Sequence, residues 1–308
     1  MDLPKAGRDF TIFRCFLAIM MTLIRLHYRR VLVGTLFFGL AGFLQFNAVD
    51  DGATLAIDLL ITFLFMLIIG LLGFIGVSLF PSFRVVMEIG ALVFFAMAVL
   101  QRSSFSRVTD GLPDWILSCS VFFFFALLHH IIYGQWWQKS GLGFAVRLNS
   151  KFKTRQRPEE VWARLVPNPN DLGAYYTKTL RAFDPKPGEP GHFVQKIGLG
   201  GSAVLELQIE VKECSPFRRF HYDFHADTSD RNRTFNRGTC DIQLTDLGAD
   251  GTLVEISEIN EKLAVGEALL MWFDNLGAQV SASARAVLDG SRDWTLIGKM
   301  RRDVQALS

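Results

Sequence analysis

The apolar residues of this chain are distributed unevenly, and this limits its fold more than any other feature. Nearly all of the long apolar runs lie before Trp137, and a regular alternation of charged and apolar residues starts near Phe144. The apolar content of 50% and the net charge of +2 therefore average over two unlike parts. The sequence predicts a membrane α-helical bundle followed by one water-soluble domain.

Four apolar segments are long enough to cross the hydrocarbon layer, which needs about 20 residues of helix. Turns that contain Asp50 and Pro81, and a polar stretch that starts at Arg102, separate them. We therefore predict a four-helix transmembrane domain over residues 31–135, followed by a linker over residues 136–146. The four predicted spans are residues 31–49, 55–80, 85–101 and 114–133.

A fifth apolar stretch, residues 10–26, has the pattern of an amphipathic helix. Polar residues that include Arg14 and Arg25 recur on one face, opposite apolar residues such as Phe13 and Leu17. A helix of this kind lies in the membrane interface, where anionic lipids attract its cations. We expect residues 1–30 to form such an interfacial segment, and the alternative is a fifth spanning helix.

The basic residues set the expected orientation. Lys and Arg gather at the N-terminus, at Arg84 and after Tyr133, whereas only Arg102 and Arg107 lie on the opposite side. Positive charge stays on the cytoplasmic side of a membrane. The sequence therefore predicts a multi-pass protein of a bacterial inner (plasma) membrane, with both termini and the soluble domain in the cytoplasm.

Three of the ionisable residues inside the predicted spans are a glutamate and two histidines. Glu88 is about one turn into the third span, and His129 and His130 are about one turn from the end of the fourth, so all three should lie at a similar depth. Charge in hydrocarbon is costly and often functional, which points to a polar cluster that binds a head group, a cofactor or a proton. The alternative is that Glu88 pairs with a histidine or reaches the interface and only fixes helix packing.

The second part of the chain has the pattern of an α+β domain. A strand near residues 145–156 precedes a short helix that Pro158 opens, and six further extended segments follow, separated by Gly, Pro, Asn and Asp. Short turns between sequential strands imply an antiparallel sheet. Residues 264–289 carry one wide apolar stripe, which predicts a single long helix that covers the sheet.

This order of elements resembles the START-like superfamily, also called SRPBCC, over residues 147–289. The residues that carry the likeness are the run 158–162 (PEEVW) after the first strand, the run 215–220 (SPFRRF), the run 251–254 (GTLV) and the long helix. The resemblance implies a helix-grip fold, in which a curved antiparallel sheet wraps around a long C-terminal helix. We assign residues 147–308 to this domain. The resemblance also implies a cavity for an apolar molecule between the sheet and the long helix.

The lining of this cavity is predicted from the middle of the long helix stripe and from the more apolar face of each strand. Complete filling of the same space by side chains would instead make an ordinary core. The inward strand faces are expected to be mostly apolar. The predicted lining residues are Trp162, Tyr175, Phe193, Leu207, Tyr222, Phe224, Ile242, Ile256, Trp272, Phe273 and Leu276.

Other chemistry has weak support in the sequence. His221 and His225 share one face of a strand, but that face should be the solvated one. The four cysteines form no CxxC pair, and no nucleophile motif or phosphate loop is present. We expect no metal, no cofactor and no nucleic-acid partner.

The leading function hypothesis is therefore a binding protein. Its soluble domain would hold a lipid or an isoprenoid- or polyketide-like molecule for transfer, sensing or presentation. The expected partners are membrane lipids and the apolar ligand, with a membrane protein as a further candidate. The alternatives are a cyclase- or dehydratase-like enzyme, or a structural partner in a membrane complex.

Overall fold

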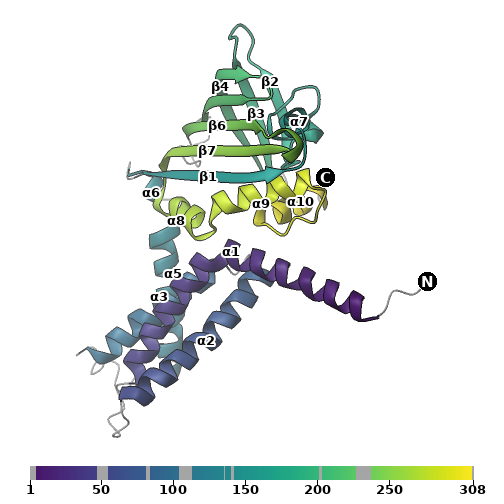
Figure 1. The fold of residues 1–308 in the computed structure, drawn as a ribbon. Coiled ribbons are helices and arrows are strands. Elements are labelled where there is room, and N and C mark those ends of the chain that lie inside the picture. Colours follow the sequence, from purple (N-terminus) through teal and green to yellow (C-terminus); the bar gives the residue numbers. More distant parts are fainter. Residues whose placement is uncertain are drawn as a thin grey trace. The chain divides into compact units, whose positions relative to one another are not determined.

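A computed structural model describes residues 5–46, 55–80, 84–103, 113–134, 136–139, 142–200, 203–226 and 237–306. The chain divides into two compact units, Met1–Gln135 and Trp136–Ser308 (Figure 1). We call them the helical unit and the sheet unit and describe each by itself.

The helical unit contains α1 (Lys5–Phe46), α2 (Leu55–Leu79), α3 (Arg84–Arg102) and α5 (Asp114–Tyr133). Helix α1 packs against α2 and α3, and α3 contacts α5. Glycines allow this approach, because the side chain of Met87 on α3 fills the space where Gly34 of α1 and Gly73 of α2 lack a Cβ.

The prediction of four spans is wrong in its count. Among the described residues, two helices are long and apolar enough to cross a membrane, Leu55–Ser78 and Arg84–Arg102. The apolar part of α5, Cys119–Tyr133, is shorter. The segment 31–49 is not a separate helix, because α1 runs without a break from Lys5 through the basic residues to Phe46. Arg and Leu are good helix formers, so the basic residues before position 31 do not end the helix.

The exposure of α2 distinguishes it from a helix in the core of a soluble protein. Only 11% of its most apolar window is buried. Large side chains such as Leu60, Phe63 and Leu71 are more than half exposed. Helices that are apolar around their whole circumference need an apolar environment.

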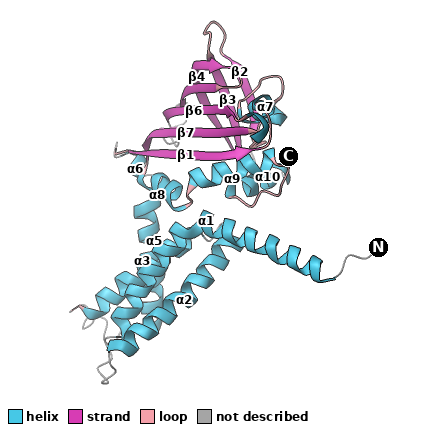
Figure 2. Cartoon of the chain, viewed as in Figure 1, coloured by secondary structure: helices cyan, strands magenta, loops and turns pink. Residues whose placement is uncertain are grey.

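The sheet unit is built on one seven-stranded antiparallel sheet in the order β1-β7-β6-β5-β4-β3-β2 (Figure 2). The antiparallel sheet expected from the sequence is confirmed. Neighbours in sequence are neighbours in the sheet except that β1 pairs with β7. The strands are β1 (Phe144–Thr154), β2 (Leu180–Pro185), β3 (His192–Gly200), β4 (Ala203–Ser215), β5 (Arg219–Ala226), β6 (Arg237–Asp246) and β7 (Thr252–Leu263).

Short helices complete the sheet unit. Helix α6 (Trp136–Lys139) precedes β1, and α7 (Pro158–Leu165) follows it, starting at the predicted proline. One-turn helices lie at η2 (Leu172–Ala174) and η3 (Gly248–Asp250). Three helices follow β7, and they are α8 (Val265–Phe273), α9 (Leu276–Leu288) and α10 (Leu296–Ala306).

The single long helix predicted over residues 264–289 is wrong, because the chain breaks it into α8 and α9 at Asp274 and Asn275. Asn275 has φ 48° and ψ 50°, the left-handed conformation, which asparagine adopts more readily than most residues. The break lets α9 start directly on β1. There, the Ser150 hydroxyl donates to the Gly277 carbonyl at 2.6 Å.

Glycine is required at position 277. A Cβ there would lie 2.8 Å from the Asn149 carbonyl oxygen, closer than side chains approach backbone atoms. Helix α9 therefore packs on β1 through its own backbone, while α10 contacts β3.

The core of the sheet unit lies between the inner face of the sheet and helices α7 and α9. It contains residues of strands β1, β2, β4, β5, β6 and β7, together with Val161 and Leu165 of α7 and Ala284 and Leu288 of α9. Ala284 and Val254, from opposite sides of this core, have no accessible surface.

Candidate functional site

The register of the sheet places a row of polar side chains on its inner face. On β7, the buried residues Val254 and Ile256 are followed at the same two-residue period by Glu258 and Asn260. Cys240 of β6 lies opposite Glu258, and Tyr222 of β5 lies opposite Cys240. The row Tyr222–Cys240–Glu258 therefore crosses three strands on the side that the helices cover.

Glu258 and Asn260 form a hydrogen-bonded pair. The Asn260 side-chain amide donates from Nδ2 to Glu258 Oε1 at 2.8 Å. Asn260 has no accessible surface, and its Oδ1 has no hydrogen-bond partner in the structure. Within the part of the chain that the structure describes, no Lys or Arg forms an ion pair with Glu258. The pair thus offers acceptor atoms with no compensating cation.

Burial changes the acidity of this row. It raises the pKa of Glu258, and the hydrogen bond from Asn260 opposes this only in part. Burial likewise raises the pKa of Tyr222 and of the Cys240 thiol, and these two side chains are linked by a hydrogen bond. Each of these groups is therefore harder to ionise than it would be in water.

Two further tyrosines belong to the cluster. Burial raises the pKa of Tyr175 and Tyr176, which lie between η2 and β2, and the negative charge of Glu258 contributes to both shifts. The two rings contact each other at a centroid distance of 5.0 Å. We call Tyr175, Tyr176, Tyr222, Cys240, Glu258 and Asn260 the inner polar cluster.

The inner polar cluster combines desolvation with residual accessible surface. Tyr175, Tyr176, Tyr222 and Glu258 are only partly buried, although burial is the main cause of their raised pKa values. Both facts fit side chains that border a space enclosed by protein rather than bulk water.

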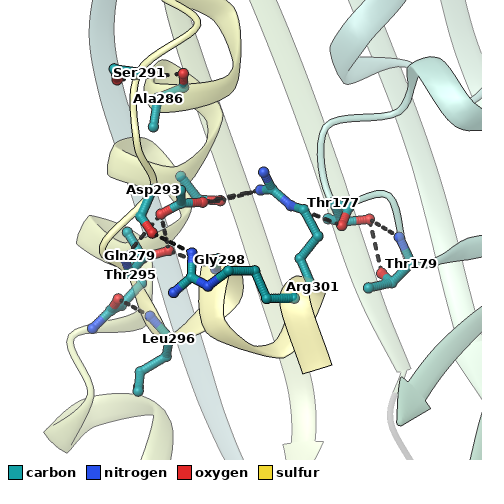
Figure 3. A network of polar contacts seen from close by, with 12 residues as sticks. Thr177, Thr179, Gln279, Ala286, Ser291, Asp293, Thr295, Leu296, Gly298 and Arg301 are labelled. Atoms are coloured by element: carbon teal, nitrogen blue, oxygen red, sulfur yellow. Dashed lines mark hydrogen bonds and ion pairs between the residues drawn. The ribbon is translucent and has the colours of Figure 1, made fainter. Parts of the chain in front are cut away.

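A network of polar contacts fixes the segment that carries the tyrosines (Figure 3). Arg301 of α10 donates to the Thr177 carbonyl at 3.2 Å and to Asp293 Oδ2 at 3.0 Å. The Ser283 hydroxyl of α9 donates to the same carboxylate at 2.6 Å. Because Thr177 directly follows Tyr176, this network ties the tyrosine segment to α9 and α10.

Eight of the predicted lining residues meet in the core. Four of them are buried there, Leu207, Phe224, Ile242 and Ile256, and four pack against it with some accessible surface, Trp162, Tyr175, Phe193 and Tyr222. The other three come from α8 and the start of α9 and lie outside this cluster. Of these, Phe273 is buried, Leu276 is partly buried and Trp272 is 45% exposed.

The expectation of mostly apolar inward strand faces missed Glu258, Asn260 and Cys240. For Glu258 and Asn260, the signal in the sequence was the two-residue alternation of inward-facing residues that starts at Val254. It was obscured because Ile259, an apolar residue, points to the outer face between two inward polar residues.

The outer face of β5 carries His221 and His225, as expected. Arg219 of the same strand pairs with Asp241 at 2.9 Å and with Glu213 at 2.8 Å. Across the described residues, no group of three or more His, Cys, Asp or Glu is placed to hold a metal ion.

The helical unit contains a second buried polar group, centred on Glu88. Arg30 of α1 donates to both carboxylate oxygens of Glu88 at 2.8 and 2.7 Å, and the Tyr133 hydroxyl of α5 donates to one of them at 2.7 Å. Arg30 has no accessible surface and Glu88 only 3%. These three residues thus join α1, α3 and α5.

The proximity of Glu88 to His129 or His130 stays a prediction. Both histidines are exposed. His129 contacts the Tyr133 ring at 5.6 Å between centroids, and Tyr133 in turn bonds to Glu88. The role of Arg30 could not be predicted from the sequence, where it belongs to the predicted interfacial segment.

We predict that Arg30→Met or Glu88→Gln lowers the free energy of unfolding by about 3–5 kcal/mol, because each leaves a buried polar partner uncompensated. The double variant Arg30→Met/Glu88→Leu should recover most of this loss. Thermal unfolding of the detergent-solubilised full chain measures both. Tyr133→Phe serves as a milder comparison, since it removes one bond to a charged group, about 1.5–3 kcal/mol. If the double variant loses as much free energy of unfolding as the two single variants together, Arg30 and Glu88 are not coupled.

We also predict that Glu258→Gln stabilises the protein at neutral pH. The pKa of folded Glu258 is raised above its unfolded value of about 4.5, so the folded state binds more protons and stability falls as pH rises through that window. Above the window, the variant should gain about 1.4 kcal/mol for each unit by which the pKa is raised. Below about pH 4 the difference should vanish.

Unfolding temperatures between pH 4 and pH 8 test this prediction. Glu255→Gln is the matched control, since Glu255 lies on the outer face of the same strand and pairs with Lys151. A Glu258→Gln variant that is less stable than wild type at pH 8 would contradict the prediction. It would show that the folded protein stabilises the negative charge of Glu258.

Comparisons with known proteins give no family. No protein-family model matches the sequence, and no curated protein matches it. Among solved structures, a protein from Mesorhizobium loti is 19% identical, covers 47% of this chain and 98% of its own, and has a TM-score of 0.32. A conserved protein of unknown function from Enterococcus faecalis is 10% identical, covers 56% of this chain and 97% of its own, and has a TM-score of 0.34.

Proposed function

We propose that this chain is a membrane-anchored protein whose sheet unit, a START-like domain, binds a hydrophobic ligand between its sheet and α9. One observation carries the proposal. Tyr175, Tyr176 and Tyr222 keep some accessible surface, yet burial raises the pKa of all three. A space enclosed by protein and bordered by these aromatic side chains would account for both properties. Ligand sites are typically apolar concavities with a few convergent polar groups.

The architecture of the sheet unit supports the same proposal. The predicted START-like runs coincide with element starts, since Pro158 opens α7 and Gly251 precedes β7. Helices α9 and α10 cover the inner face of an antiparallel sheet, as a helix-grip fold requires. The helix-grip fold has one long C-terminal helix, and the break before α9 departs from that pattern.

The helical unit supports membrane anchoring. The exposed apolar surface of α2 would be stable in lipid and costly in water. We propose that the end of the unit holding Arg30, Glu88 and Tyr133 faces the cytoplasm, because the basic residues gather near it. A sheet unit tethered there would meet lipid ligands at a high effective concentration.

Glu258 favours a second candidate function, an enzyme that transfers a proton to an apolar substrate. A carboxyl group with a raised pKa on the inner face suits a general acid. In that case Glu258→Gln protein should co-purify with the substrate rather than the product, a molecule that differs from the wild-type ligand in mass or, for an isomer, in chromatographic retention. Identical molecules in both proteins would exclude this function.

We predict that Val280→Phe displaces the ligand at little cost in stability, because Val280 of α9 is only partly buried where it packs against the core. Full-length protein extracted from membranes would be analysed by native mass spectrometry for a co-purifying molecule. Wild type and the control Arg285→Phe should carry it, since Arg285 is exposed on α9. Absence of any bound molecule, with a loss of about 1–3 kcal/mol in Val280→Phe, would indicate a packed core instead.

We predict that Arg84→Cys in intact cells is protected from a membrane-impermeant maleimide, whereas Arg102→Cys reacts. The reason is that residues 84 and 102 lie at opposite ends of α3, and the proposal places residue 84 on the cytoplasmic side. The parent protein controls for its own cysteines. Labelling at position 84 and not at position 102 would show that α3 has the opposite orientation in the membrane.

A further inference from the structure

We propose that the helical unit has a lipid site of its own, a groove that takes the acyl chain of an ester-linked membrane lipid and holds its ester group at Gln45 and Gln101. All the lining residues belong to the helical unit. The inference therefore goes beyond the hydrophobic ligand proposed for the sheet unit and rests only on the proposed membrane anchoring.

The groove has a volume of about 410 Å³ and is lined by residues of α1, α2, α3 and α5. On α1, Phe38, Ala41 and Gln45 follow one another at helical spacing and so share one face. Phe38 packs against Phe94 of α3 at 5.3 Å between ring centroids. Ala41, between the two larger side chains, is small and buried, which leaves the space open. Its volume is in the range of ligand sites.

The walls of the groove are apolar except at one end. The remaining apolar lining includes Phe65, Val93, Met97 and Val121, and no Lys, Arg, Asp or Glu of the described residues takes part. Apolar cavities in proteins do not hold water. Inside a membrane, the molecules next to such a groove are hydrocarbon chains. An acyl chain is therefore the occupant that fills it.

Two amides form the polar end of the groove. Gln45 Nε2 donates to Gln101 Oε1, and both side chains are exposed and line the groove. An amide group has two donor hydrogens and one acceptor oxygen, so this bond leaves Gln101 Nε2 as a donor. The carbonyl of an ester accepts hydrogen bonds and donates none. The amide pair thus suits the ester group at the head of an acyl chain.

The depth of the amides also fits an ester group. Gln101 lies in the last turn of α3, next to the exposed residue Arg102, whose guanidinium suits a lipid phosphate. Ester groups lie where the hydrocarbon core of a bilayer meets its head groups. Arg30 and Glu88 join the same two helices about 20 Å away, at 1.5 Å per residue. The proposed orientation therefore puts the amides in the outer leaflet.

A competition between matched lipids tests the ester contact. The full-length protein in detergent would be offered equal amounts of dipalmitoyl phosphatidylglycerol and its dihexadecyl ether analogue, and native mass spectrometry would measure the bound ratio. The two lipids share head group and chain length, but the ether lacks the carbonyl. We expect wild type to favour the ester about fivefold, the equivalent of one hydrogen bond, and Gln101→Leu to bind both equally.

Two tryptophan variants locate the lipid. Met97→Trp should fill the groove and lower the amount of bound ester lipid about tenfold or more, since overpacking leaves no room for the chain. Val99→Trp is the matched control, because Val99 is exposed on the same helix and does not line the groove. It should bind as wild type does.

Three results would overturn the inference and leave the ligand of the sheet unit untouched. They are equal binding of ester and ether by wild type, unchanged binding by Met97→Trp, and equal loss in both tryptophan variants. A protein that stays dispersed in buffer without detergent would instead overturn membrane anchoring. The wild-type ratio decides the matter even if Met97→Trp fails to fold.

Discussion

The direct contact between the backbone of α9 and strand β1 determines the arrangement of the sheet unit. Because residue 277 has no side chain, the helix starts against Asn149 and is held by the bond from Ser150. The rest of α9 then crosses the inner face, where Val280, Ala284 and Leu288 meet the core. From there the chain reaches α10, whose Arg301 fixes the tyrosine segment. One close contact at an edge strand thus sets the distance between helix and sheet.

Glu88 and Glu258, two carboxylates on inner faces of the described residues, have opposite surroundings. Glu88 receives at least three hydrogen bonds, two of them from a guanidinium, and so remains compensated between three helices. Glu258 receives one, from a neutral amide. Desolvation of a charged group is costly unless it is paired, so the first arrangement suits a permanent structural link. The second leaves a group whose protonation state depends on what lies next to it.

Much of the sheet unit could be predicted from the sequence, because alternation along a strand and turn residues between strands are local signals. The break at Asn275 could not, since the apolar stripe continues through it and the cause is the approach of Gly277 to β1. Glu258 was missed for a different reason, because the apolar Ile259 beside it obscures the two-residue alternation that starts at Val254. In the helical unit, Arg30 was taken as the end of a segment, although only its distant partner Glu88 explains its position.

The unbroken course of α1 has a geometric consequence. At 1.5 Å per residue, its 42 residues extend about 63 Å, roughly twice the hydrocarbon thickness of a bilayer. The 25 residues from 5 to 29 precede the pairing residue Arg30 and so form an arm of about 38 Å beyond that point. With apolar side chains such as Met21 and Ile24 exposed along it, this arm would enlarge the footprint of the protein on the lipid surface well beyond the cross-section of its bundle.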